Sequence, residues 1–161
     1  MIPLLPTRMI ESKQNSKGNF MEAVEQWHRA MRSKDAGIWE ELLDEDVVFH
    51  SPVVFTPQKG KKITMMYLMA ATGVFGSSND TIDLIENSQT ESKFHYINEI
   101  IGQNSALLEF ESEIEGTYIN GADLLKWNEN NKLIEVKVMV RPLQAVNMLH
   151  QKMKAMLESM T

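Results

Sequence analysis

The chain has 161 residues, a formal net charge of -6, 43% hydrophobic residues and no cysteine. Its length predicts one domain that can bury a core, and the absence of cysteine excludes disulfides, thiolate metal sites and thiol nucleophiles. The mild acidity argues against a nucleic-acid-binding face, and no apolar run approaches the roughly 18 residues that span a membrane. We therefore expect a cytoplasmic protein that binds neither nucleic acid nor membrane.

The first 18 residues differ in composition from the rest of the chain. Two prolines interrupt the short apolar start, and residues 11–18 are polar. We expect residues 1–18 to form a flexible N-terminal arm and residues 19–161 to form a single domain.

Two helices and a strand are predicted at the start of this domain. Asn19 followed by Glu22 resembles a capping box, which predicts that a helix begins at Asn19. Its apolar positions recur at helical spacing and are Phe20, Val24, Trp27 and Met31. Asp35 can cap a second, short helix. Residues 47–50 then predict a strand that ends before Pro52.

A third helix is predicted after Gly60. The apolar stripe expected to face the core comprises Ile63, Met66, Tyr67 and Ala70. Residues 77–80 have the composition of a loop, and residues 81–93 indicate neither helix nor strand.

From residue 94 onward the apolar period changes from 3.6 to 2, which is typical of strands. Strands are predicted at residues 94–101, 105–115, 117–127 and 132–140. In the second strand apolar side chains alternate with glutamates, which predicts one core face and one solvated face. Pro142 fits the first turn of a last helix. The fold class is therefore α+β, with a curved antiparallel sheet and helices packed on one face.

The order of elements, together with residues 24–52 and 121–142, resembles the nuclear transport factor 2-like superfamily. Within it, the chain is most similar to the SnoaL-like group, which includes ketosteroid isomerases and polyketide cyclases. The resemblance covers about residues 19–157. It implies a cone-shaped fold around a pocket for a small hydrophobic, carbonyl-bearing molecule, with no organic cofactor and no metal. It also implies a homodimer formed through the sheet.

Asp123 is the principal candidate for a catalytic residue. Its strand places it beside apolar neighbours, and burial among them raises the pKa of a carboxyl until its neutral form can donate a hydrogen bond. The resemblance also aligns Asp123 with the acid that ketosteroid isomerases keep protonated. The alternative is an aspartate that turns to solvent or caps a loop.

Two other positions of the isomerase pattern do not match. Ser51 stands before Pro52, where the resemblance implies a general base, and a hydroxyl has no useful pKa there. Trp27 stands in place of the first-helix tyrosine, and its indole donates a hydrogen bond but exchanges no proton. Typical ketosteroid isomerase chemistry is therefore not expected. Gly121, two residues before Asp123, also excludes the arginine that epoxide hydrolase-like relatives would place there.

His50 and His95 are the remaining candidate bases. Strand alternation points His50 away from the pocket if Ser51 points inward, and nothing in the sequence favours His95 over it. The residues expected to shape the pocket are Trp27, Ser51, Met66, Tyr67, Phe110 and Trp127. Histidine spacing predicts no metal site.

Two classes of function remain open. The first is a cofactor-free isomerase, cyclase or dehydratase in which Asp123 acts as an acid. The alternative is a non-catalytic module that binds a ligand or another protein through the same fold. The glutamates at positions 109, 111, 113 and 115 lie too far apart on one strand to bind a single ion. They predict a solvated face or the rim of a dimer interface.

Overall fold

The structure is a computed structural model that describes residues 15–33, 35–76 and 93–161. Residues 1–14 of the predicted arm and the predicted loop at residues 77–80 lie outside the described residues. The first helix, α1, spans Asn15–Arg32. It therefore begins four residues before the predicted cap, and Asn19 lies inside the helix rather than at its start.

Helix α2 spans Ala36–Leu42 and begins as predicted. The Asp35 carboxylate accepts a hydrogen bond of 2.8 Å from the backbone N–H of Gly37, so Asp35 is the N-cap. The strand that follows is longer than predicted. Strand β1 spans Leu43–His50 and begins directly after α2, so it also includes the acidic residues 44–46.

Six strands form a single curved, open sheet in the order β2-β1-β6-β5-β4-β3. The remaining strands are β2 (Gln58–Lys59), β3 (His95–Ile101), β4 (Ser105–Ile114), β5 (Thr117–Trp127) and β6 (Leu133–Arg141). The four predicted strands of the second half are confirmed. Every neighbouring pair is antiparallel except β1 and β6, which run parallel.

Helix α3 spans Lys61–Phe75, and helix α4 spans Leu143–Ser159. The predicted inner face of α3 is correct for Ala70, which is buried, and for Tyr67, which packs against the core, but wrong for Ile63 and Met66, which line a surface hollow. The buried side chains of α3 are Thr64, Leu68, Ala70, Thr72 and Phe75. Because apolar residues occur on nearly every side of this helix, hydrophobicity alone does not select one stripe.

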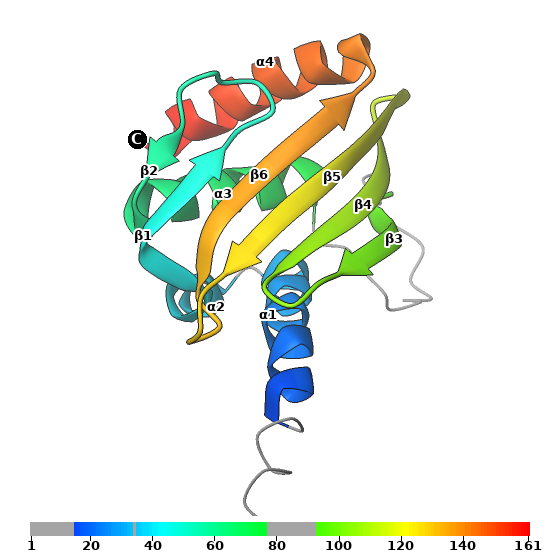
Figure 1. Ribbon diagram of the computed structural model, residues 1–161. Helices are drawn as coiled ribbons and strands as arrows, with labels where there is room; N and C mark the ends of the chain where they lie inside the picture. The colour runs from blue at the N-terminus through cyan, green and yellow to red at the C-terminus, as the bar shows by residue number, and fades with distance from the viewer. Residues whose placement is uncertain (1–14, 34, 77–92) are drawn as a thin grey trace, which may run out of the picture.

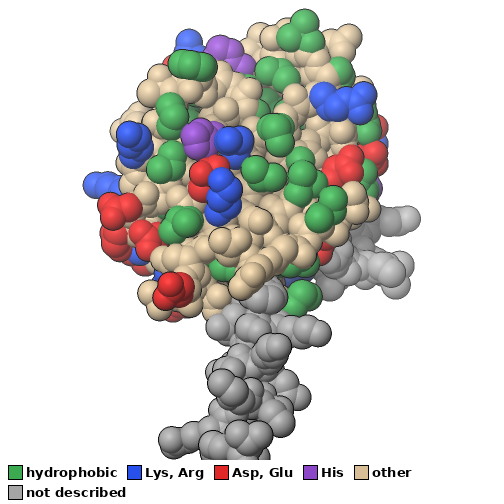
Figure 2. Space-filling model, in the orientation of Figure 1, with side chains coloured by type: hydrophobic (Ala, Val, Ile, Leu, Met, Phe, Trp, Pro, Cys, Tyr) green, Lys and Arg blue, Asp and Glu red, His purple; other side chains and the backbone are tan. Residues whose placement is uncertain are grey.

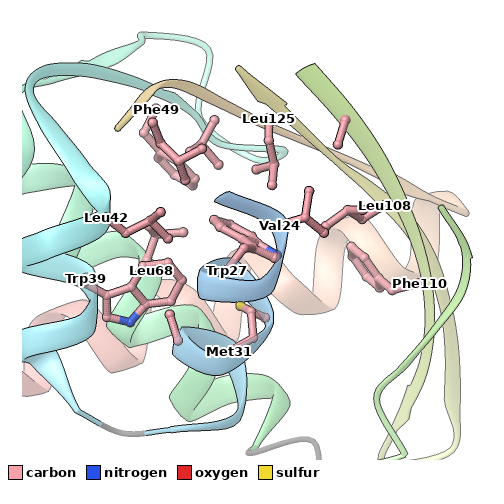
Figure 3. Close-up of a cluster of buried hydrophobic side chains, with 14 of the residues drawn as sticks. Val24, Trp27, Met31, Trp39, Leu42, Phe49, Leu68, Leu108, Phe110 and Leu125 are labelled. Carbon is pink, nitrogen blue, oxygen red and sulfur yellow. The ribbon is translucent and has the colours of Figure 1, made fainter. Parts of the chain in front are cut away.

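The helices lie behind the sheet in Figure 1 and leave the opposite face of β4, β5 and β6 uncovered. We call this uncovered side the outer sheet face. The core fills the space between helices and sheet, and Figure 3 shows Trp27 of α1 among residues of α2, β1, β4 and β5. Trp27 meets Trp39 edge-on, with ring centroids 5.3 Å apart. Within the described residues, no helix is long and apolar enough to cross a membrane.

Candidate functional site

Asp123 lies on the core side of the sheet, in the middle of β5. Strand alternation places it on the same face as Ile119 and Leu125, which are both fully buried. Only 4% of the Asp123 surface is exposed. Burial disfavours the carboxylate and raises the pKa of Asp123 to about 7, although a hydrogen bond from Tyr96 acts in the opposite direction.

Tyr96 and Trp27 connect Asp123 to the edge strand and to the first helix. The Tyr96 hydroxyl donates a 2.8 Å hydrogen bond to Oδ2 of Asp123, and the indole N–H of Trp27 donates to the Tyr96 oxygen at 2.9 Å. Burial, and then the neighbouring charge of Asp123, raise the pKa of Tyr96 well above 10. We call this arrangement the Trp27–Tyr96–Asp123 chain. It keeps a neutral phenol beside a carboxyl that titrates near neutral pH.

Aromatic rings hold Tyr96 in this position. Phe94 meets the Tyr96 ring edge-on at 5.1 Å, and Phe110 lies opposite Tyr96 on β4 with ring centroids 6.4 Å apart. Gly121 pairs with Phe110 across β4 and β5, and a Cβ there would lie 2.3 Å from Cζ of Phe110. Because Gly121 has no side chain, the Phe110 ring can lie across β5 beside the Trp27–Tyr96–Asp123 chain.

Sequence reasoning did not identify Tyr96 as a site residue. The signal that could have identified Tyr96 is its spacing from Phe94. Residues two positions apart on an extended chain share one face, and Phe94 is a core residue. A β-bulge between Tyr96 and Asn98 breaks that alternation. The residues after the bulge are largely exposed. The sequence of β3 therefore shows no regular alternation that would indicate which face points to the core.

The structure does not bring His50 or His95 to Asp123. His50 pairs with Lys137 of β6, whereas the preceding residue, Phe49, is buried in the core, so His50 points to the outer sheet face. His95 is exposed on that same face opposite Glu111, with Nε2 at 3.7 Å from the carboxylate. Both candidate bases thus lie on the far side of the sheet from Asp123.

Of the six expected pocket residues, three are buried on the core side with Asp123 and three are not. Trp27, Phe110 and Trp127 are buried on the core side with Asp123. The Ser51 hydroxyl instead accepts a local hydrogen bond from the backbone N–H two residues later, at 3.2 Å. Tyr67 packs against Phe49 with ring centroids 5.4 Å apart.

Met66 lies on a surface hollow rather than beside Asp123. The hollow has a volume of about 460 Å³ and is lined by Met66 and by Glu45, Lys59, Gly60, Lys61, Lys62 and Ile63. A smaller hollow of about 120 Å³ lies between α1, α2 and the turn after β5. Neither hollow includes Asp123.

The Trp27–Tyr96–Asp123 chain has a defined chemical capacity. With Oδ2 accepting from Tyr96, a protonated Asp123 presents the O–H of its other oxygen as a donor. A pKa of about 7 means that this protonated form is substantially populated at neutral pH. Among the described residues, no group of three or more histidines and carboxylates converges as metal ligands would.

Comparison with known proteins identifies the fold. No protein-family model matches the sequence, and no curated protein matches it. Among solved structures, a steroid delta-isomerase from Pseudomonas aeruginosa superposes with a TM-score of 0.73 at 24% identity, over 88% of this chain and 93% of that chain. A protein with a cystatin-like fold from Silicibacter pomeroyi gives 0.69 at 22% identity, over 83% of each chain.

A third solved structure carries the name of the superfamily. An NTF2-like protein of unknown function from Mesorhizobium loti gives a TM-score of 0.60 at 14% identity, over 88% of this chain and all 100% of that one. The chain therefore has the nuclear transport factor 2-like, cystatin-like α+β fold expected from its order of elements. At these identities the likeness concerns the fold, and function has to be argued from the site.

Proposed function

We propose that the chain binds a small hydrophobic molecule with a carbonyl group, and that protonated Asp123 donates a hydrogen bond to the carbonyl oxygen. The observation that carries this proposal is the buried Asp123 carboxyl, held at Oδ2 by Tyr96. A carboxylic acid in an apolar setting is a strong donor to an oxygen on which negative charge develops. The apolar and aromatic side chains around the Trp27–Tyr96–Asp123 chain favour a hydrophobic ligand.

The reaction class that fits this donor is enolisation, as in a cofactor-free isomerase, cyclase or dehydratase. Removal of a proton beside a carbonyl leaves negative charge on the oxygen, and the Asp123 donor stabilises that charge. The chain shares its fold with a steroid delta-isomerase, so the fold is compatible with chemistry of this class. Ser51 is occupied in a local turn and supplies no base, so the proposal does not include typical ketosteroid isomerase chemistry.

Hydrogen–deuterium exchange at the α-carbon of a ketone tests the proposed role of Asp123. We expect the protein to accelerate exchange of α-tetralone in D₂O, measured by proton NMR. Asp123→Leu removes the donor and should lower the rate by about 10²-fold or more, as for the loss of one oxyanion donor. Ser112→Ala is the matched control, because the Ser112 hydroxyl is buried on the core side of the neighbouring strand and has no hydrogen-bond partner among the described residues.

The outcome also separates the enzyme from the binding module. An unchanged rate for Asp123→Leu would refute the catalytic role of the carboxyl. If native mass spectrometry finds a co-purified ligand that the protein returns unaltered, and no ketone exchanges, the non-catalytic alternative replaces the enzyme.

We also propose that two copies of the chain associate through the outer sheet face. Apolar side chains cross the middle of this face, and Figure 2 shows them between charged groups. These side chains are Ile100, Leu107, Ala122, Leu124 and Met139, of which Ile100 and Met139 are 62% and 48% exposed. A contiguous apolar area of this kind is typical of an interaction surface.

Charge complementarity favours a second copy as the partner. On the outer sheet face, β4 carries Glu109, Glu111 and Glu113, whereas β6 carries Lys137 and Arg141 together with one acid, Glu135, whose Oε1 lies 3.8 Å from Nζ of Lys137. A two-fold axis that lies in this face along β5 places β4 of one copy over β6 of the other. The same face is then self-complementary, as the interface of a two-fold dimer requires.

A further inference from the structure

His28 and Glu99 form a polar pair beside the Trp27–Tyr96–Asp123 chain. Nε2 of His28 lies 2.6 Å from Oε1 of Glu99, which joins α1 to the edge strand β3. Glu99 pairs with the fully buried Leu108 across β3 and β4, so its side chain points to the helix side of the sheet. The carboxylate therefore lies on the same side of the sheet as Asp123.

His28 contacts Tyr96 directly. The His28 ring meets the Tyr96 ring edge-on, with centroids 4.9 Å apart and planes at 77°. The side chain of His28 is 19% exposed and that of Glu99 is 35% exposed. Both side chains of the pair are therefore partly open to solvent.

The contact with Glu99 defines which ring nitrogen is available. A carboxylate accepts a hydrogen bond and does not donate one, so it holds the proton of a neutral imidazole on Nε2. Nδ1 then keeps its lone pair. A histidine that a carboxylate orients in this way is the arrangement of a general base.

We propose that His28 is the catalytic base of the enolisation, with Glu99 as the residue that positions it. Nδ1 of His28 takes the proton from the α-carbon, and the electron pair of that C–H bond forms the C=C bond of an enolate. The carbonyl oxygen then carries the charge and accepts the hydrogen bond of Asp123. In D₂O the proton on Nδ1 exchanges with solvent, so transfer of a deuteron from His28 back to the α-carbon gives exchange, and transfer to a conjugated carbon gives isomerisation.

This inference rests on the proposed function and adds the base that the function lacks. His50 and His95 lie on the outer sheet face. His150 is exposed on α4. Among the histidines, which all lie in the described part of the chain, His28 is therefore the one that contacts the Trp27–Tyr96–Asp123 chain.

Chemical rescue tests the base. We expect His28→Ala to lower the α-tetralone exchange rate by about 10²-fold or more, since a positioned general base contributes about 10²–10⁴-fold. Added imidazole should restore exchange in His28→Ala in proportion to its concentration. A purely structural role of His28 would lower the melting temperature without such rescue. The control is His150→Ala, which should exchange at the wild-type rate and show no response to imidazole.

Glu99→Gln tests the positioning role. The amide keeps the size of the side chain but can donate to Nε2, which would let the proton move to Nδ1. We expect kcat to fall about tenfold or more with KM nearly unchanged, and Glu99→Asp to recover part of the loss. Circular dichroism should show that both variants keep the wild-type fold.

The results distinguish this inference from the proposed function. If Asp123→Leu abolishes exchange while folded His28→Ala exchanges as fast as wild type, the base is elsewhere and the proposed function stands. Loss of activity in His28→Ala without rescue by imidazole would also overturn the assignment. If the wild-type protein catalyses no exchange, both the enzymatic function and the base are refuted.

Discussion

At the scale of single residues, Asp123 combines a chemical role with a cost to stability. Its ordinary pKa is 3.8, and burial raises the pKa in the folded protein to about 7. The folded state therefore binds the proton more tightly than the unfolded chain does. As pH rises from about 4 to 7, the unfolded chain ionises freely while the folded protein has to bury a charge, so stability is lost over this interval.

The free energy of unfolding should therefore fall across that pH range. A difference of about 3 pH units corresponds to a loss on the order of 4 kcal/mol, at about 1.36 kcal/mol per unit. Asp123→Asn has no charge to bury and should remove most of this slope, which urea denaturation at several pH values measures. Tyr96→Phe removes the bond that lowers the pKa of Asp123 and should extend the loss to higher pH. Equal slopes for wild type and Asp123→Asn would contradict the assignment.

At the scale of elements, β4 and β5 pack most tightly against each other where the Phe110 ring of β4 lies over Gly121 of β5. A Cβ at position 121 would lie 2.3 Å from Cζ of Phe110 and 2.7 Å from the backbone oxygen of Met139. The second contact involves backbone of β6, which cannot move without disturbing the β5–β6 pairing. Three neighbouring strands therefore require a residue without a side chain at this position.

Gly121→Ala should be strongly destabilising for this reason. We expect a loss of about 3 kcal/mol, at the upper end of the effects of overpacking, measured by chemical denaturation. Adding Phe110→Leu should recover part of this loss, because it removes one of the two clashes. Gly73→Ala is the matched control, since its Cβ would meet only the flexible end of Met156, at 2.9 Å. Similar losses for the two glycine variants would show that the Phe110 contact is not decisive.

Local sequence patterns predicted most elements correctly. The alternation of β4 and the Asp35 cap depend on residues close together in the chain, and both are confirmed. The start of α1 was predicted wrongly, and the core face of α3 was predicted only in part. Helix α3 is apolar on nearly all sides, so tertiary packing selects its inner face. Helix α1 extends through a polar segment that lacks helical periodicity in its sequence.

At the scale of the whole molecule, the candidate site is a product of topology. The Trp27–Tyr96–Asp123 chain joins a helix, an edge strand and a central strand that are separated by many residues. Apolar neighbours in the sequence were enough to predict that Asp123 is buried. No local pattern, however, predicts that Tyr96 supplies its hydrogen bond or that His28 lies beside Glu99. Those contacts depend on where α1 crosses β3.

The outer sheet face leads to a prediction for the assembled molecule. Leu124 lies on the outer sheet face of β5, and the proposed two-fold axis runs along this strand. Leu124→Lys would therefore bring a lysine of each copy close to the same lysine of the other copy. Juxtaposed like charges cost several kcal/mol, so we expect a dimer to become a monomer in analytical ultracentrifugation. Leu143→Lys, at a position 71% exposed at the start of α4, is the control and should remain dimeric.

A charge swap then tests the orientation of the two copies. Glu111 of β4 and Arg141 of β6 lie in the same row of the sheet, so the two-fold axis places each over the other in the partner. Glu111→Lys or Arg141→Glu alone should weaken the dimer, and the effect should diminish at high salt, which screens exposed charges. The double variant should restore association, because the pair is re-formed with reversed signs. Interfaces of standard size bind with Kd values that begin at about micromolar. A wild-type protein that stays monomeric at about 100 μM, roughly a hundredfold above such a Kd, would refute the dimer. Failure of the double variant to recover would refute this orientation.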